Sequence, residues 1–214
     1  KIARDPSINI GINTMQKTAK QLNVHLAFGY AELTSDGVYN SLMLINDQGQ
    51  SIGNYRKVHL PPHEANIFIK GDRYCLCKTS FGNIGLQICW DAAFPEPARL
   101  YAESGADLLL VVSAWEQPYA EQWILSVRSR SFDNGLPVAA VNRVGTDLKL
   151  EFCGNSLITD AMGNILAQAA TDHEEYLILD LDQKLLKQQK QLFSTQMKEL
   201  QKHTYSQHCL DICP

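Results

Sequence analysis

The sequence of 214 residues predicts a layered α/β fold with a largely antiparallel or mixed sheet. β-rich runs follow one another in the first half, and strands alternate with helical segments in the second half, which favours helices packed on sheets. Apolar side chains make up 45% of the residues and charged side chains 20%, as in a globular protein with one sizeable core. Because no repeat or linker precedes residue 183, we expect one domain over residues 1–182 and a separate tail over residues 183–214.

The first half of the chain predicts one helix and then a meander of strands. Apolar residues recur at helical spacing from Ile12 to Leu22, which predicts an amphipathic helix. The β-rich runs that follow are separated by Ser-Asp-Gly and Asp-Gln-Gly turns, and they cover Val24–Glu32, Val38–Asn46 and Ser51–Arg56. Residues 57–72 then show no period and contain two prolines and a glycine, so we expect a long loop of the kind that carries function.

The second half predicts strands and helices in alternation. We expect a strand pair at Cys75–Thr79 and Asn83–Cys89, then a helix over 97–104, the buried strand Leu108–Ser113, a helix over 119–133 and a strand over 138–144. Three further strands are expected near residues 154–159, 165–169 and 176–180. The tail predicts a helix from 183 to about 203, whose apolar stripe docks either on its own domain or on another subunit.

Composition and charge exclude several classes of partner. The net charge is −4 and no basic cluster is interleaved with aromatic residues, so we expect no nucleic-acid partner. The longest uninterrupted apolar stretch, Leu108–Val112, is far shorter than the roughly 20 residues that cross a membrane, and we expect no membrane partner. No apolar segment follows a basic start at the N-terminus, so we expect a cytoplasmic protein. The cysteines and histidines lack metal-ligand spacing, and we expect neither a metal nor another cofactor.

Cys89 is the first candidate for chemistry. It ends an apolar strand and stands directly before a short turn and a helix, at the carboxyl end of a strand, where α/β folds keep catalytic groups. A nearby helix N-terminus or cation can lower the pKa of such a thiol. The alternative is a buried, inert cysteine, which is the commonest fate of this residue.

Lys57 and Glu64 are the other candidates, and they share the loop of residues 57–72. A lysine held beside a thiol could stabilise the thiolate and donate to a developing oxyanion, whereas a solvated lysine would do neither. Glu64 on its own is compatible with an ordinary surface carboxylate. His59 and His63 lie in the same loop and are rival bases for a Cys/His pair.

The order of the motifs resembles the nitrilase superfamily of carbon–nitrogen hydrolases. The motifs are Tyr-Arg-Lys-x-His-Leu at 55–60, the loop glutamate at 64, Gly-x-x-Ile-Cys-Trp-Asp-x-x-Phe-Pro-Glu at 85–96 and Asn-Arg-Val-Gly at 142–145. The resemblance extends to about residue 182. It implies a four-layer α-β-β-α sandwich, no cofactor, and a homodimer or larger homo-oligomer.

The resemblance also implies a Glu-Lys-Cys catalytic triad. Lys57 and Cys89 match the lysine and the nucleophile of the family, and Glu64 matches a further glutamate on the loop after the lysine. Trp90 occupies the position whose backbone N–H joins the lysine in binding the oxyanion, and Trp115 lies where members line the acyl pocket. The first glutamate of the triad, the general base, lies in members upstream of the helix that begins here near Ile12. We therefore expect this domain to be N-terminally incomplete, without the first strand, the first helix and the base.

The expected activity is hydrolysis of the C–N bond of a small amide or an N-carbamoyl compound, through a thioester on Cys89 and with release of ammonia. The sequence Cys-Trp-Asp favours an amidase or carbamoylase over a nitrilase, because nitrilases tend to have Cys-Trp-Glu. Two alternatives stay open. One is an inactive nitrilase-like fragment or subunit that acts as a binding or assembly module, and the other is a Cys/His hydrolase that uses His59 or His63.

Overall fold

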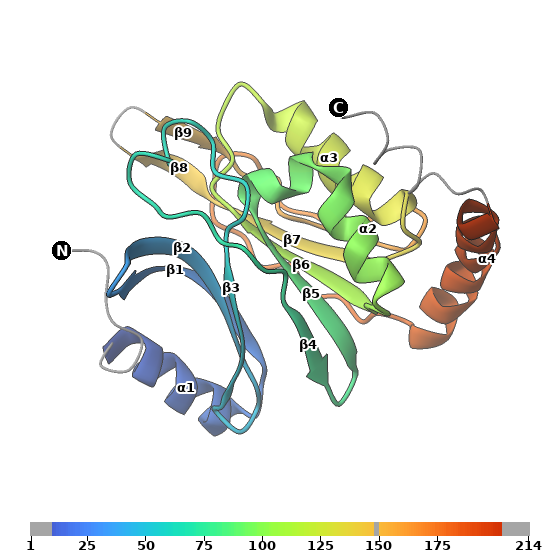
Figure 1. Cartoon of the computed structure of the whole chain (residues 1–214), viewed down its shortest axis with the longest axis horizontal. Coiled ribbons are helices and arrows are strands. Elements are labelled where there is room, and N and C mark those ends of the chain that lie inside the picture. The colour runs from blue at the N-terminus through green and yellow to red at the C-terminus, as the bar shows by residue number, and fades with distance from the viewer. Residues whose placement is uncertain (1–9, 148–149, 203–214) are drawn as a thin grey trace, which may run out of the picture.

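The structure, a computed structural model, describes residues 10–147 and 150–202, with side chains described as far as residue 193. Four layers follow one another: the helix α1, a three-stranded sheet, a six-stranded sheet, and the helices α2 and α3 (Figure 1). The predicted α-β-β-α sandwich is thus confirmed.

The first sheet is the expected antiparallel meander in the order β1-β2-β3. Its elements are α1 (Ile10–Leu22), β1 (Leu26–Thr34), β2 (Gly37–Ile45) and β3 (Ser51–Arg56). Successive side chains of a strand face opposite sides of the sheet, so Met43 and Ile45 pack towards α1 whereas Leu42 and Leu44 pack towards the second sheet. The apolar face of α1 is buried at Ile12, but at the last turn of the helix Leu22 is exposed.

The second sheet is mixed, with the strand order β11-β10-β7-β6-β5-β4. Its strands are β4 (Leu76–Thr79), β5 (Gly82–Ile88), β6 (Leu108–Ser113), β7 (Val138–Asn142), β10 (Leu157–Thr159) and β11 (Ile165–Gln168). The three central strands β5, β6 and β7 are parallel, and the others pair antiparallel. Parallel neighbours require crossovers, and the crossover helices α2 (Pro95–Glu103) and α3 (Ala120–Phe132) cover the outer face of this sheet.

Two apolar cores hold the second sheet in place. The core between the two sheets contains Leu42, Leu44, Tyr55, Cys77, Ile84, Leu86 and Ile88. The core under α2 and α3 is centred on Trp123, which is fully buried and donates its indole N–H to the carbonyl of Asn155 (2.8 Å). The carboxyl ends of β5 and β6 are therefore fixed from both sides.

The predicted strand over residues 176–180 is wrong. Residues 169–182 form neither a helix nor a strand, and the side chains of Tyr176 and Ile178 are 96% and 94% exposed. Their sequence has the alternation of a strand, but a strand also needs a neighbouring backbone to pair with, and residues 176–180 pair with none of the strands in the described structure.

Two other boundaries differ from expectation. The strand expected over 138–144 ends at Asn142, and the chain continues into a separate two-stranded sheet of β8 (Val144–Asp147) and β9 (Leu150–Cys153) that periodicity did not indicate. The next strand begins at Leu157 instead of residue 154, because Gly154 and Asn155 both have a φ of 56°, which is left-handed backbone that no strand contains.

The helix α4 (Gln183–Lys202) confirms the helix expected in the tail, and its described side chains contact the same chain. Lys190 Nζ donates to the Ala106 carbonyl (2.6 Å) and pairs with the Asp107 carboxylate (3.0 Å). The Phe193 ring meets the Phe132 ring edge-on at 5.5 Å. Of the two docking modes expected for the tail, these contacts favour docking on its own domain. Within the described residues, no helix is both long and apolar enough to span a bilayer.

Candidate active site

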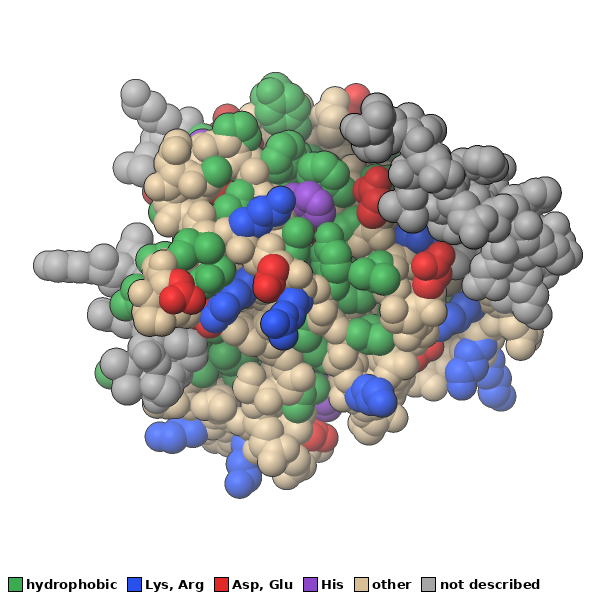
Figure 2. Space-filling model, viewed as in Figure 1, with side chains coloured by type: hydrophobic (Ala, Val, Ile, Leu, Met, Phe, Trp, Pro, Cys, Tyr) green, Lys and Arg blue, Asp and Glu red, His purple; other side chains and the backbone are tan. Residues whose placement is uncertain are grey.

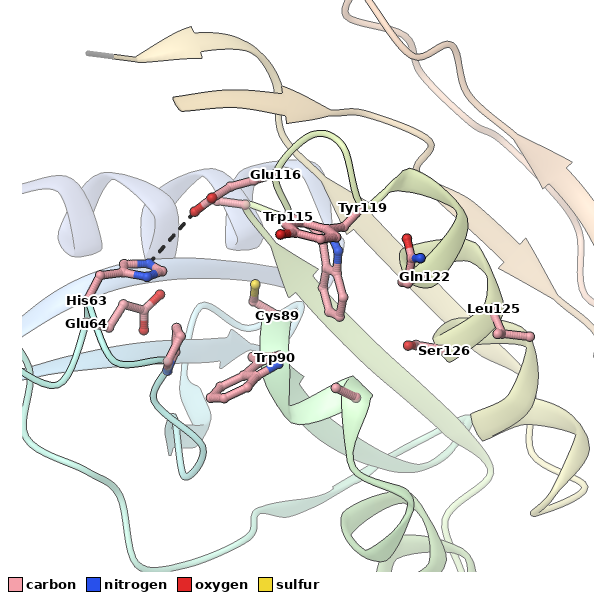
Figure 3. Close-up of a pocket in the computed structure, with 13 residues that line it drawn as sticks. His63, Glu64, Cys89, Trp90, Trp115, Glu116, Tyr119, Gln122, Leu125 and Ser126 are labelled. Carbon is pink, nitrogen blue, oxygen red and sulfur yellow. Dashed lines mark ion pairs between the residues drawn. The ribbon is translucent and has the colours of Figure 1, made fainter. Parts of the chain in front are cut away.

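The structure brings Lys57, Glu64 and Cys89 together at one end of the sheets. Lys57 follows the last residue of β3, Glu64 lies in the loop after it, and Cys89 is the first residue after β5. Glu64 and Cys89 line a cavity of about 510 Å³ together with Trp90 and Trp115 (Figure 3). In the view of Figure 2, apolar side chains gather in the upper middle, and basic and acidic side chains are interspersed around them.

The Lys57 ammonium is fully buried and is held by one carboxylate. Nζ donates to both oxygens of Glu64, at 2.8 and 2.9 Å, and the carboxylate also accepts from the Asn40 amide at 3.5 Å. A buried charge is costly unless it is paired and hydrogen-bonded, so this pair fixes the ammonium at one position. The backbone of Lys57 is fixed as well, because its N–H donates to the Asn40 carbonyl and its own carbonyl accepts from the Gly71 N–H.

Cys89 has a strained backbone at the point where β5 turns into a short 3₁₀ helix. Its φ is 50°, a left-handed conformation that a residue with a Cβ adopts only when its surroundings impose it. The turn directs the side chain of the half-buried Cys89 into the space between Glu64 and Trp115 (Figure 3). Strain of this kind is concentrated at functional sites, where it presents a reactive atom.

Burial raises the pKa of the Cys89 thiol above its ordinary value. The Lys57 ammonium is the strongest of the groups that oppose this rise, followed by the polar groups of Ser113 and Ala114, while the Glu64 carboxylate adds to it. The resting thiol is therefore protonated at neutral pH, and it must lose its proton when it attacks.

Asp91 is a structural centre that motif reasoning left without a role. Its fully buried carboxylate accepts from the Tyr55 hydroxyl (2.7 Å), the His59 backbone N–H (2.9 Å) and the Ile88 N–H (3.0 Å). It thereby joins the end of β3, the start of the loop and the turn that carries Cys89. Its place in Cys-Trp-Asp, two residues after the candidate nucleophile, is the signal that could have identified it.

The two histidines of the loop, His59 and His63, lie in different surroundings in the structure. The His59 ring lies 2.9 Å from the Asp91 carboxylate through Nδ1 and stacks on Phe94 at 4.0 Å, outside the residues that line the Cys89 cavity. His63 does line this cavity, with Nε2 3.8 Å from a Glu116 carboxylate oxygen. Any Cys/His pair would therefore involve His63.

The wall of the cavity opposite Glu64 is largely aromatic and comes from the segment between β6 and α3 and from α3 itself. The Trp115 backbone N–H donates to Oδ1 of the buried Asn142 (2.7 Å), and its ring lies 5.5 Å from that of Trp123. Tyr119 and Leu125 complete this wall, and periodicity alone did not place them in a pocket. Among the residues that the structure describes, no three metal-ligating side chains converge.

The four-layer α-β-β-α sandwich, with Lys57, Glu64 and Cys89 at one end of its sheets, agrees with the nitrilase superfamily that the sequence resembles. The chain belongs to the carbon–nitrogen hydrolase family, whose sequence model matches residues 12–191. A probable nitrilase of Schizosaccharomyces pombe is 41% identical over 201 residues, which cover 90% of this chain and 74% of that protein. An (R)-stereoselective amidase of a Pseudomonas species is 33% identical over 181 residues, which cover 84% of this chain and 66% of that enzyme.

The fold has solved counterparts as well. The crystal structure of a carbon–nitrogen hydrolase from Helicobacter pylori matches with a TM-score of 0.85 at 27% identity, over 92% of this chain and 74% of that one.

Proposed function

We propose that this carbon–nitrogen hydrolase cleaves small primary amides through a thioester on Cys89. One observation carries the proposal: a buried ammonium, fixed by a carboxylate, belongs to the same site as a thiol that a strained turn directs into an apolar pocket. A fixed cation beside a nucleophile is what the oxyanion of an acyl-transfer reaction requires.

In the proposed first half-reaction, Cys89 Sγ attacks the amide carbonyl carbon. The negative charge that develops on the carbonyl oxygen is stabilised by Lys57 Nζ and by the backbone N–H of Trp90. The tetrahedral intermediate then collapses, the C–N bond breaks, and the nitrogen leaves as ammonia after it takes up a proton. In the second half-reaction water attacks the thioester, the C–S bond breaks, and the acid leaves while the thiol regains its proton.

In this scheme a carboxylate transfers the proton between the thiol, the leaving nitrogen and the attacking water. Glu64 uses both oxygens to hold Lys57, so we assign it the positioning of the ammonium. The family resemblance assigns the base to a glutamate upstream of α1, and the printed sequence has no glutamate before Glu32. Glu32 is itself bound by Arg56 through both oxygens, at 2.7 and 2.9 Å, away from the pocket.

The pocket wall supports an amide with a small apolar acyl group. Trp90, Trp115 and Leu125 offer apolar surface, and a relative that acts as an amidase supports this choice over a nitrile. An N-carbamoyl compound is the second candidate substrate. We also propose a cytoplasmic homo-oligomer, because the described cysteines are free thiols and α3 exposes Leu125 and Phe132.

The test is trapping of the acyl-enzyme. The full chain is incubated with short aliphatic amides from acetamide to butyramide, quenched with acid, and analysed by intact mass and peptide mapping. We expect one acyl increment on the peptide that contains Cys89, absent in Cys89→Ala and retained in the matched control Cys75→Ala. If no increment forms although the amide raises the melting temperature of the folded chain, the proposal fails, and the binding-module alternative replaces it.

A further inference from the structure

A second pair of reactive groups lies outside the pocket. Cys75 stands directly before β4 and Cys77 lies within it, and their Sγ atoms are 3.5 Å apart. Residues two apart on an extended segment face the same side, and here both side chains join the core between the two sheets. Neither cysteine lines the Cys89 cavity, and the proposed hydrolysis uses neither.

The facing strand leaves room for these thiols because it has a glycine there. A Cβ on Gly53 of β3 would lie 2.2 Å from Cys77 Sγ and 3.3 Å from Cys75 Sγ. Any side chain at position 53 would therefore displace the sulfur atoms. The absence of a side chain at this point of β3 lets both thiols occupy the same space.

The two thiols differ in burial and in acidity. Cys77 is 2% exposed, and its pKa is raised by the hydrogen bond with Cys75 and by burial. Cys75 is half-buried, and the same hydrogen bond lowers its pKa to about 7. Near neutral pH the less buried thiol, Cys75, is thus partly ionised beside the protonated thiol of Cys77. This is the arrangement of a redox-sensitive cysteine and a resolving partner.

We propose that Cys75 and Cys77 form a site of reversible oxidation by hydroperoxides. In the first step the Cys75 thiolate attacks the O–O bond of the hydroperoxide, a proton is taken up, and a sulfenic acid and water (or an alcohol) are formed. In the second step the Cys77 sulfur displaces the hydroxyl from the Cys75 sulfur, which forms the S–S bond and releases water. The two thiols lose two electrons in total, and the hydroperoxide accepts both.

The product is a disulfide that a thiol reductant reopens with ease. Residues two apart on an extended segment have Cα atoms about 6.6 Å apart, near the upper limit of about 6.8 Å for a disulfide. A bond formed there is strained, and strained disulfides are the readily reduced ones. Closure also pulls on the Cys75 N–H, which donates to the Tyr101 hydroxyl at 3.1 Å.

The test uses the full chain with Cys89→Ser, so that the pocket thiol cannot compete. The chain is treated with hydrogen peroxide at pH 7.5, its free thiols are alkylated, and it is digested and mapped by mass spectrometry. We expect the peptide with residues 75 and 77 to lose two hydrogen atoms and to resist alkylation, and dithiothreitol to restore both thiols. This readout needs no catalytic activity, so it stands or falls separately from the proposed hydrolysis.

Two single variants in the same background sharpen the test. With Cys77→Ser the sulfenic acid on Cys75 should persist and be captured by dimedone. With Cys75→Ser the Cys77 thiol should stay reduced. The proposal is overturned if Cys75 in the parent chain proceeds to sulfinic acid while Cys77 remains alkylatable, or if Cys75 pairs with a cysteine other than Cys77.

Discussion

Two cysteines that border the same core, Cys89 and Cys75, hold their thiols in opposite electrostatic settings. Burial raises the pKa of Cys89 although Lys57 opposes it, whereas the thiol of Cys77 lowers the pKa of Cys75 to about 7. The thiol that faces the pocket is thus the less acidic one. Cys89 is therefore the candidate nucleophile because it lies beside Lys57 and faces the pocket, and not because its thiol is ionised at rest.

The difference has a chemical logic. A thiol that is partly ionised at neutral pH reacts through its thiolate with any electrophile that reaches it, including peroxides. A protonated thiol that ionises as it attacks reacts chiefly with a substrate bound against its oxyanion donors. Cys89 suits turnover and Cys75 suits oxidation, and the following experiments are ways to break or sharpen that division.

The largest effect is expected from removal of the pocket thiol. Cys89→Ala should lower kcat/KM for amide hydrolysis by about 10⁴-fold or more, because no nucleophile remains. The matched variant Cys75→Ala should leave kcat/KM within a few-fold. Ammonia release measures both. Equal losses in the two variants would erase the division between the thiols.

Removal of the ammonium should have the next largest effect. Lys57→Met deletes an oxyanion donor, and we expect kcat to fall by roughly 10²- to 10³-fold. The Glu64 carboxylate then loses its partner, so the melting temperature should fall as well. Lys78→Met, on the exposed face of β4, is the control and should change neither quantity. Unchanged kcat in Lys57→Met would remove the lysine from the proposed mechanism.

Asp91→Asn should destabilise the turn that carries Cys89. The buried amide has one oxygen where the carboxylate has two, and its NH₂ group meets donors, so we expect a loss of about 2–4 kcal/mol in the free energy of unfolding. Urea unfolding followed by circular dichroism measures this. The exposed Asp36→Asn should stay within about 0.5 kcal/mol of the parent chain. A similar change in both variants would show that the Asp91 network has no special weight.

The smallest effect is a difference in pH dependence. A lowered pKa makes Cys75 a thiolate above about pH 7, whereas a raised pKa keeps Cys89 protonated until the pH exceeds the ordinary thiol range. Alkylation by iodoacetamide, followed by peptide mapping, should thus reach half its maximal rate near pH 7 at Cys75 and at higher pH at Cys89. The reverse order would contradict both electrostatic settings.

The local sequence pattern was sufficient to predict those strands and helices whose structure follows from their own residues. The β-rich runs predicted the three strands of the first sheet, and the order of the motifs selected Glu64, Cys89, Trp90 and Trp115, which line one pocket. Their catalytic roles stay proposals. The sequence pattern failed where the structure of a segment depends on a pairing partner. Residues 176–180, with the exposed Tyr176 and Ile178, were predicted as a strand but pair with no strand in the described structure.

Distance along the chain explains what motif reasoning missed at the site. The Asp91 carboxylate is bound by Tyr55 and by the His59 backbone, which are 36 and 32 residues away. The lowered pKa of Cys75 depends on its contact with Cys77, and the spacing of the two cysteines in the sequence indicates that contact. It also depends on the space left by Gly53, which the sequence does not reveal. Such contacts become visible only when two strands from different sheets are placed face to face.

The glycine on β3 constrains which mutations the chain can accept together. Gly53→Ala alone places a carbon 2.2 Å from the Cys77 sulfur. Replacing Cys77 by alanine removes this clash and leaves contacts of 3.3 Å to the Cys75 sulfur and 3.4 Å to the Leu86 side chain. The two positions are therefore epistatic, and the order of the two substitutions matters. A chain that gives up the thiol pair can accept alanine at position 53, where Leu86 still limits the size of the side chain, and a chain that keeps the pair is held to glycine.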